Sequence, residues 1–583
     1  MCGIFGAVGK KLDKYDEGGL KPVLSSLSKR GPDGNGILFL PSVVLGHTRL
    51  SIVDLKSGAQ PMKDGGKNTY ISFNGEIYNY KELKKELIEK GHQFITESDT
   101  EVILKSYAEY GTDCLSHLDG MFAFALWDEK KQVLFLARDR FGKKPLYYTF
   151  DKDGNFLIAS EIKALFAAGI KGEVDPEAID NYLTLMYIPP WKTVYKNIHV
   201  IPPAHAGIFE DGKIKIWKYW ELEEKPIKDS YAKAREKIKN LFEDSVKKRM
   251  VADVEIGSLL SGGVDSTLVS AYAQKFSKTP IKTFSVGYGE HINELPYAKE
   301  ASEKIGTDHY TIQAGGELIK ELEKVIEYMD EPHADSSNFP QHILSELASS
   351  KVKVALSGDG ADELFMGYGW YWKYDNTKKI VRVKNAIFSN RFKEHIKNIS
   401  VFSKAERKKL WNDKSALNDD FIGKNIKKIN LFDLSTYLPG QLLSKVDRTS
   451  MMHSLEVRCP FLDYRLAEYV YNLPENYKMK NGMGKIMLKD ILLGIMPEEF
   501  VNRKKQGFGA PIKEWLREKK TEKFVIEALG VDSPIYKYLK NDVVGKIISS
   551  FYAGKDDSFC YKVWSILCLS LWLKHHGKYH VSR

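Results

Sequence analysis

The chain is poor in cysteine, with five in 583 residues. Because they are few, odd in number and far apart, neither a disulfide framework nor a paired-cysteine zinc or redox motif is available. We therefore predict a reducing compartment, the cytoplasm. The five are Cys2, Cys114, Cys459, Cys560 and Cys568.

Long apolar runs and blocks of like charge are also missing. The most apolar late stretch, Val563–Leu573, lies well short of the roughly 20 residues that span a bilayer, so it predicts a buried helix. The N-terminus has no charged segment followed by a long apolar core, and we expect no signal peptide. Lys and Arg (87) exceed Asp and Glu (77) only mildly, and without basic runs this argues against nucleic-acid partners. With no apolar stretch long enough to span a bilayer, we also expect no membrane partner.

What is present is a globular composition in two parts, with 43% hydrophobic and 28% charged residues. In the first part, short alternating or apolar runs predict strands at 69–73, 121–127, 132–137 and 155–159, with helices at 80–90 and 100–110. In the second part, helical patterns alternate with strands at 255–260, 282–286 and 353–356, which is typical of a parallel sheet covered by helices. We predict domains at 2–215 and 231–583, a linker at 216–230, and a largely helical C-terminal part.

The second residue is a potential nucleophile. Removal of Met1 would leave Cys2 first in the chain, with its thiol and its α-amine on the same carbon. The α-amine, with a pKa of about 8, is a base well matched to a thiol with a pKa of about 8.5. Taken alone, however, Cys2 is more simply interpreted as a small apolar residue of an edge strand.

Six motifs in order change that interpretation: MCGIFG (1–6), RGPDG (30–34), GHTRLSIVD (46–54), NGEIYN (74–79), SDTEV (98–102) and RDRFGKKPLYY (138–148). Together they resemble the glutaminase domain of N-terminal-nucleophile glutamine amidotransferases, an α+β sandwich with αββα layers. The resemblance implies that Cys2 is the nucleophile and that Asn74 and Gly75 stabilise the oxyanion. It also implies that Arg49 binds the α-carboxylate of glutamine, and that Asp99 and Glu76 bind its α-ammonium.

A glycine-rich turn opens the second part. The SGGVDS segment (Ser261–Ser266) follows an apolar strand and precedes a helical pattern. Exposed N–H groups, the helix dipole and the serine hydroxyls would therefore favour an anion there. The turn is no Walker A loop, because GxxxxGK[ST] is absent. It resembles the pyrophosphate loop of ATP pyrophosphatases, which implies a Rossmann-like α/β domain.

Further motifs extend the resemblance: FSVGY (284–288), SGDGADELFMGY (357–368), SKVDRTSMMHSLEVRCPFLD (444–463), GKIMLK (484–489) and RKKQGF (503–508). With both parts in this order, nearly the whole chain resembles glutamine-hydrolysing asparagine synthetases. The resemblance implies ATP and Mg²⁺, with the metal held by Asp265 and Asp362. The residues implied to hold ATP are Leu259, Ser261, Gly262, Gly263, Asp265, Ser266, Val286, Ser357 and Gly358.

Two further positions bear on catalysis. Lys485 matches the lysine that stabilises charge on the α-phosphorus during adenylation. Lys489, four residues on, shares a helical face with it and is the rival candidate. Asp359 stands where some relatives have Glu. If it is the base when ammonia attacks, its shorter arm must be compensated by a water or a backbone shift.

The resemblance implies ATP-dependent amidation of aspartate to asparagine by a cytoplasmic homodimer. Ammonia would come from glutamine through a sheltered tunnel, and β-aspartyl-AMP would be the intermediate. An amidotransferase of the same architecture that acts on another carboxylate, a cell-wall peptide or a sugar acid, remains open. A tRNA-modifying ATP pyrophosphatase usually has RNA-binding appendages and often paired cysteines, and this chain has neither. A β-lactam-forming cyclase with a decayed glutaminase is disfavoured by intact Cys2, Arg49 and Asn74.

Overall fold

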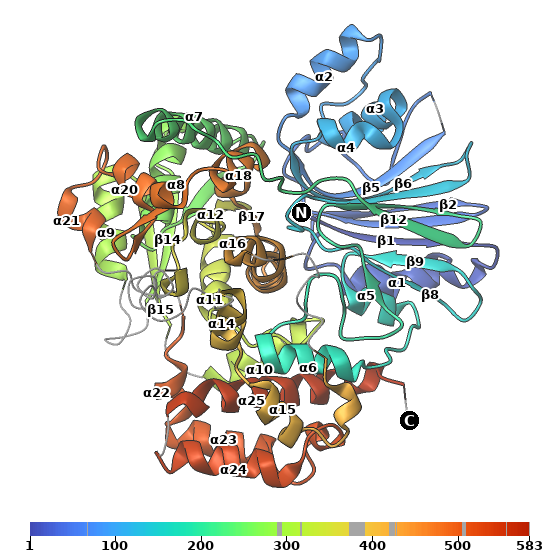
Figure 1. Ribbon diagram of the computed structural model, residues 1–583. Coiled ribbons are helices and arrows are strands. Elements are labelled where there is room, and N and C mark those ends of the chain that lie inside the picture. The colour runs from blue at the N-terminus through green and yellow to red at the C-terminus, as the bar shows by residue number, and fades with distance from the viewer. Residues whose placement is uncertain are drawn as a thin grey trace.

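The computed structural model describes residues 1–66, 68–287, 294–314, 318–371, 391–418, 426, 428–503, 509–554 and 557–581. Tyr288 of the FSVGY motif and residues 504–508 of RKKQGF lie outside the described residues. Two parts lie side by side, a sheet-rich sandwich in blue to teal and a helix-rich part in green to red (Figure 1). We refer to residues 1–218 as the N-terminal half and to the chain from residue 231 on as the C-terminal half.

The N-terminal half contains two six-stranded antiparallel sheets. The first has the order β10 (His199–Val200), β8 (Tyr147–Phe150), β9 (Phe156–Ala159), β1 (Cys2–Val8), β3 (Val43–Arg49) and β2 (Gly34–Leu40). The second has the order β12 (Lys213–Lys218), β11 (His205–Glu210), β7 (Val133–Arg138), β6 (Gly120–Asp128), β5 (Thr69–Ile77) and β4 (Met62–Lys63).

Helices cover the outer faces of both sheets (Figure 1). In β1 the side chains alternate, as strand geometry requires: Ile4 and Val8 join the core between the sheets, whereas Phe5 and Ala7 join the core beneath the helices. This arrangement confirms the predicted αββα sandwich. The helices are α1 (Glu17–Ser26) and α5 (Ile162–Ala167) on the first sheet, and α2 (Tyr80–Glu89), α3 (Asp99–Tyr110) and α4 (Cys114–His117) on the second.

The predicted strands and helices of this half are present as β5, β6, β7, β9, α2 and α3. Helix α1 was not predicted, because Gly18, Gly19 and Pro22 weaken its helical pattern. Strand β12 runs to Lys218, beyond the predicted domain end at residue 215, and pairs with β11 throughout. Residues 219–230 then form no helix or strand before α7 (Tyr231–Arg249), which Ser230 caps. We accordingly propose a domain boundary just after β12.

The C-terminal half is built on a parallel sheet, as predicted, and this sheet has five strands. Their order is β15 (Asp308–Gln313), β14 (Lys282–Gly287), β13 (Ile256–Leu259), β16 (Val354–Leu356) and β17 (Glu456–Arg458). The sequence predicted β13, β14 and β16, but not the largely polar β15 or the three-residue β17. Three helices pack against the strands: α8 (Val264–Phe276), α9 (Leu295–Ile305) and α11 (Asn338–Ser349). In sequence, α10 (Leu318–Tyr328) lies between β15 and β16, and α12 (Ala361–Phe365) lies between β16 and β17.

The described residues from 391 on are mainly helical, as predicted. The apolar stretch at 563–573 lies in the buried helix α25 (Cys560–His576), which also fits the prediction. No helix in the described part of the chain has both the length and the apolarity to cross a membrane. The helices are α14 (Arg391–Ile399), α15 (Lys404–Leu410), α16 (Ile429–Phe432), a π-helix (Asp433–Leu443), α17 (Ser444–Met451), α18 (Tyr464–Tyr471), α19 (Glu475–Lys478), α20 (Ile486–Leu492), α21 (Glu498–Asn502), α22 (Ile512–Leu516), α23 (Lys519–Ala528) and α24 (Asn541–Tyr552).

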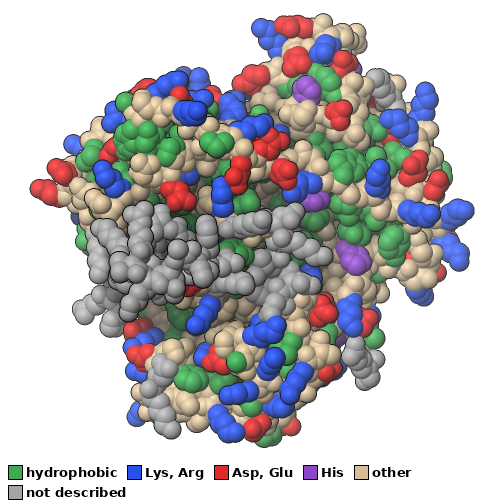
Figure 2. Space-filling model, viewed as in Figure 1, with side chains coloured by type: hydrophobic (Ala, Val, Ile, Leu, Met, Phe, Trp, Pro, Cys, Tyr) green, Lys and Arg blue, Asp and Glu red, His purple; other side chains and the backbone are tan. Residues whose placement is uncertain are grey.

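The two halves share apolar clusters. Leu50 and Met121 of the N-terminal half pack in the same cluster as Leu356 and Leu462 of the C-terminal half. Strand β17 lies beside the N-terminus of the chain (Figure 1). All five cysteines are free and buried, in agreement with the predicted lack of disulfides. On the face shown in Figure 2, basic and acidic side chains are interspersed, without a large patch of one sign.

Candidate active sites

Cys2 lies buried at the start of β1. Its backbone N–H donates to Oδ1 of Asn74 on β5 at 2.9 Å, so the two sheets meet at this point. Directly opposite Cys2 in the β1–β3 ladder is Arg49, and opposed residues of an antiparallel pair project from the same face. The structure therefore brings three of the predicted residues together.

The side-chain amide of Asn74 is only partly used. Its Oδ1 accepts from Cys2, whereas its Nδ2 is buried and has no hydrogen-bond acceptor in the described part of the chain. Buried amide donors nearly always have partners, so an unused one beside a nucleophile is suited to stabilising an oxyanion. The neighbouring Gly75 has φ +153°, and a Cβ there would lie 2.0 Å from the carbonyl oxygen of Met121.

Three charged residues predicted to bind glutamine lie at this end of the sandwich. The Arg49 guanidinium donates to the carbonyl oxygens of Val53 (3.2 Å) and Asp54 (2.6 Å), and makes no ion pair with any described residue. Burial raises the pKa of Asp99 to about 6, and it raises the pKa of Glu76 well above its usual value. Asp99 is held by the N–H of Ile77 at 3.0 Å. An arginine without an ion-pair partner among the described residues, together with two buried carboxyl groups, suits a zwitterionic substrate.

Met1 precedes Cys2 in this structure and is itself buried. Its ammonium forms an ion pair of 3.0 Å with Oε2 of Glu456 on β17. Burial raises the pKa of the Cys2 thiol, and the Met1 ammonium opposes that effect. The thiol therefore needs a base before it can act as a nucleophile.

The glycine-rich turn joins β13 to α8, as expected for an anion site. Its serines bond each other, with 3.0 Å between Oγ of Ser261 and Oγ of Ser266. Gly262 has φ +72°, and a Cβ there would lie 2.6 Å from the carbonyl carbon of Tyr297. Arg503, which was not assigned a role from the sequence, donates to the carbonyl oxygen of Gly262 at 2.6 Å and so places a cation beside the turn.

Lys485 lies between the two carboxylates predicted to hold metal. Its ammonium contacts Asp265 and forms an ion pair of 2.8 Å with Oδ1 of Asp362. By contrast, Lys489 takes part in no ion pair among the described residues, and burial lowers its pKa. The residue brought to the carboxylates is therefore Lys485.

Four of the residues predicted to hold ATP lie on, or directly after, neighbouring strands of the parallel sheet. Leu259 and Val286 are buried in one apolar cluster, while Ser357 and Gly358 follow β16. A Cβ on Gly358 would lie 3.1 Å from the backbone nitrogen of Ser266, so this turn closely approaches the glycine-rich loop. Asp359 accepts a hydrogen bond of 2.7 Å from the hydroxyl of Ser357.

One residue that sequence reasoning missed, Arg458 on β17, contacts both sites. Its guanidinium lies 3.3 Å from Oε2 of Glu76, and its carbonyl oxygen accepts from the N–H of Ser357 at 2.9 Å. Arg458 belongs to the SKVDRTSMMHSLEVRCPFLD motif, but a sequence motif does not indicate which distant segments its residues contact.

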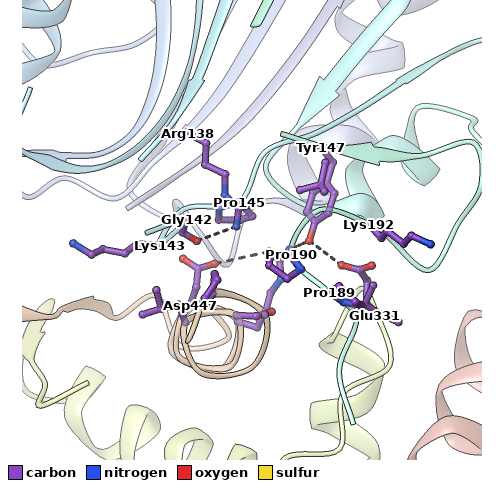
Figure 3. Close-up of a pocket in the computed structure, with 17 residues that line it drawn as sticks. Arg138, Gly142, Lys143, Pro145, Tyr147, Pro189, Pro190, Lys192, Glu331 and Asp447 are labelled. Atoms are coloured by element: carbon purple, nitrogen blue, oxygen red, sulfur yellow. Dashed lines mark hydrogen bonds and ion pairs between the residues drawn. The ribbon is translucent and has the colours of Figure 1, made fainter. Parts of the chain in front are cut away.

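A small cavity of about 40 Å³ also lies between the halves. It has space for a few waters only, so it is not a substrate pocket. In Figure 3 the hydroxyl of Tyr147 points to Glu331, to which it donates at 3.1 Å, and Asp447 rises from α17 toward the loop with Gly142 and Pro145.

Known proteins match both halves. A family model described as glutamine amidotransferase domain matches residues 1–220, and one described as asparagine synthase matches residues 237–574. Asparagine synthetase [glutamine-hydrolyzing] 1 of Bacillus subtilis is 33% identical, over 98% of this chain and 96% of its own. Asparagine synthetase [glutamine-hydrolyzing] 3 of the same organism is 36% identical, over 90% of each chain. Amidase chry2 of Gibberella zeae is 28% identical, over 85% of each chain.

The fold and the matched models define a two-part enzyme class, a glutamine amidotransferase joined to an ATP-using α/β domain. Within that class, the chain belongs to the asparagine synthase family. Members of the family are carbon–nitrogen ligases that take nitrogen from glutamine and use ATP as a substrate.

Proposed function

We propose that the protein converts aspartate to asparagine with ammonia released from glutamine, through β-aspartyl-AMP, and produces glutamate, AMP and pyrophosphate. The observation that carries this proposal is the double contact of Arg458, whose side chain meets Glu76 and whose backbone meets Ser357. Ammonia is mostly protonated and inert at neutral pH, so two sites that share one residue suit its direct transfer.

In the first reaction, the Cys2 thiolate attacks the side-chain amide of glutamine. Once Met1 is removed, the α-amine of Cys2 takes the thiol proton and passes it to the leaving ammonia. The unused Nδ2 of Asn74, with the backbone N–H of Gly75, stabilises the oxyanion. Arg49 binds the α-carboxylate of glutamine, and Asp99 with Glu76 binds its α-ammonium. Water then releases glutamate.

In the second reaction, the carboxylate of aspartate attacks the α-phosphorus of ATP. The SGGVDS turn binds the pyrophosphate through its N–H groups and through the hydroxyls of Ser261 and Ser266. Lys485 stabilises the charge that develops at the α-phosphate. Ammonia then displaces AMP, and Asp359 takes up the proton that it loses.

Mg²⁺ fits the carboxylates of this site. Asp265 and Asp362 already share one cation, the ammonium of Lys485, and carboxylate oxygens are the ligands that Mg²⁺ prefers beside phosphates. We propose that these two residues hold it, and that the ion, when bound, neutralises charge on the phosphates. A homodimer in the cytoplasm remains a prediction from the resemblance.

The experiment measures pyrophosphate release from MgATP and glutamine, with aspartate supplied or omitted, and identifies the amidated product by mass. Aspartate-dependent release with asparagine as product is expected. One relative, 28% identical over 85% of each chain, is named an amidase, so the product has to be identified directly. Glutamine hydrolysis without aspartate-dependent pyrophosphate would therefore retain the first reaction and redirect the search to other carboxylates.

A variant separates the two reactions. Cys2→Ala removes the nucleophile but touches nothing in the C-terminal site, so it should abolish glutamine-dependent synthesis and leave ammonia-dependent synthesis measurable. Both rates are followed as AMP formation, with glutamine or ammonium chloride as the nitrogen source. Loss of both in a folded variant would contradict the division into two sites.

A further inference from the structure

A single buried guanidinium joins the nucleophile to the other half of the molecule. Arg30 is fully buried, and its Nε donates to the carbonyl oxygen of Cys2 at 3.0 Å. Its Nη1 and Nη2 donate to the two carboxylate oxygens of Asp447 at 2.8 and 3.0 Å. Nη1 also donates to Glu161 at 2.9 Å. The Arg30–Asp447 pair is therefore bidentate, the arrangement that fixes a guanidinium most rigidly.

Two hydrogen bonds hold the backbone of Cys2, one at its carbonyl oxygen and one at its N–H. The backbone N–H of Cys2 donates to Asn74, and its carbonyl accepts from Arg30. A residue that begins a chain has only one covalent neighbour to orient it. The direction of its thiol then depends on such polar anchors, and a displacement of about 1 Å in a reacting group can reduce the rate about 10²-fold.

The anchor for Arg30 comes from the C-terminal half. Asp447 lies on α17. The residue before it on the same helix, Val446, packs in the cluster that contains Leu259 and Val286. Burial would raise the pKa of Asp447, but Arg30 and Lys144 hold it below its ordinary value. The carboxylate is thus charged and aimed at the N-terminal half (Figure 3).

We infer that Arg30 and Asp447 are positioning residues through which helix α17 holds Cys2 in its attacking orientation. The inference rests on the proposed role of Cys2 in glutamine hydrolysis. The C-terminal half then takes part in the first reaction and does not only receive the ammonia that this reaction releases. Asp447 acts through Arg30 and touches no substrate.

The test uses the full-length protein and two variants of the pair. Asp447→Asn keeps the size of the side chain but loses the charged fork, and Arg30→Lys keeps the charge but cannot form two parallel bonds. For each, the kcat for glutamate release should fall about 10²-fold while the KM for glutamine stays within about threefold. The double variant should lose no more than either single one, because both remove the same interaction.

Two further readouts separate positioning from general damage. Ammonia-dependent synthesis should remain within about threefold of the parent rate. The pH dependence of Cys2 alkylation by iodoacetamide should differ from that of the parent. Lys353→Gln is the control, because Lys353 pairs with Asp33 across the same two halves at 2.8 Å, at an exposed position. It should leave all these rates unchanged.

The outcomes distinguish this inference from the proposed function. If the parent protein releases no glutamate from glutamine, the proposed function is wrong. If the parent does so and both variants match its kcat, or if both activities of each folded variant fall together, the positioning role is wrong. Should Asp447→Asn fail to fold, Arg30→Lys alone decides.

Discussion

Gly75→Ala is expected to damage glutamine hydrolysis through a displacement that the structure specifies. A Cβ at this position would lie 2.0 Å from the carbonyl oxygen of Met121 and 2.7 Å from Cα of Phe122, both on β6. Ordinary contact begins near 3.4 Å, so β5 and β6 must separate by more than 1 Å. The φ of +153° adds strain for any residue with a side chain.

The size of the effect follows from that separation. Overpacking and backbone strain together should cost about 2–6 kcal/mol, seen as a lower unfolding temperature of the protein. Asn74 precedes Gly75 on the same strand, so its amide moves with it. A shift of about 1 Å in such a group lowers kcat about 10²-fold. Ammonia-dependent synthesis should stay near the parent rate, because it does not use this strand.

The assay compares glutamate release with ammonia-dependent AMP formation in the same preparation. Gly207→Ala is the matched control, because Gly207 lies in the same sheet and a Cβ there would meet its nearest atom at 3.4 Å. It should change neither rate. Glutamine hydrolysis by Gly75→Ala within about threefold of the parent would refute the reasoning, since the strand would then have absorbed the Cβ without moving Asn74.

Two further predictions concern charged groups. Lys485→Gln should reduce pyrophosphate release about 10²–10³-fold with either nitrogen source and leave glutamine hydrolysis unchanged. Pyrophosphate release by Lys489→Gln should stay within about threefold of the parent. The reverse order would assign the role to Lys489. Because the pKa of Asp99 is about 6, its carboxylate is ionised above that pH and neutral below it. The KM for glutamine should therefore rise as the pH falls through this value, and the inflection should be missing in Asp99→Asn. A KM that does not change across this pH range in the parent would contradict the proposed contact with the α-ammonium.

Much of the fold could be predicted because its signals are local. Alternation in β5, β6 and β7 and the turn between β13 and α8 depend on neighbouring residues, and each was predicted. The three-residue β17 has no such signal, since its place is set by pairing with β16. The expectation that Lys485 and Lys489 share a helical face was wrong for a similar reason. Helix α20 begins only at Ile486, and Lys485 precedes it with φ +58°, so the two lysines are not neighbours on one regular helix.

Contacts between the halves were beyond sequence reasoning for a different reason. The motifs predicted some neighbours within each half, because several of them, such as SGGVDS after β13 and SGDGADELFMGY after β16, supply the turn that follows a strand. They could not predict that Arg30 would meet Asp447, 417 positions away. That contact depends on how the two halves dock. A buried arginine requires a carboxylate, but sequence alone does not say which of the many acidic residues provides it.

The order of strands in the parallel sheet explains why the two sites lie together. The carboxyl ends of parallel strands lie at one edge, so the turn after β16, with Ser357, must open beside the end of β17. As the last strand of this sheet, β17 has one side without a partner strand among the described residues, and exposed strand edges are normally covered. Here the N-terminal half packs against this last strand, through Glu76 on Arg458 and Met1 on Glu456. This packing therefore places the proposed source of ammonia one strand away from the proposed site of its use.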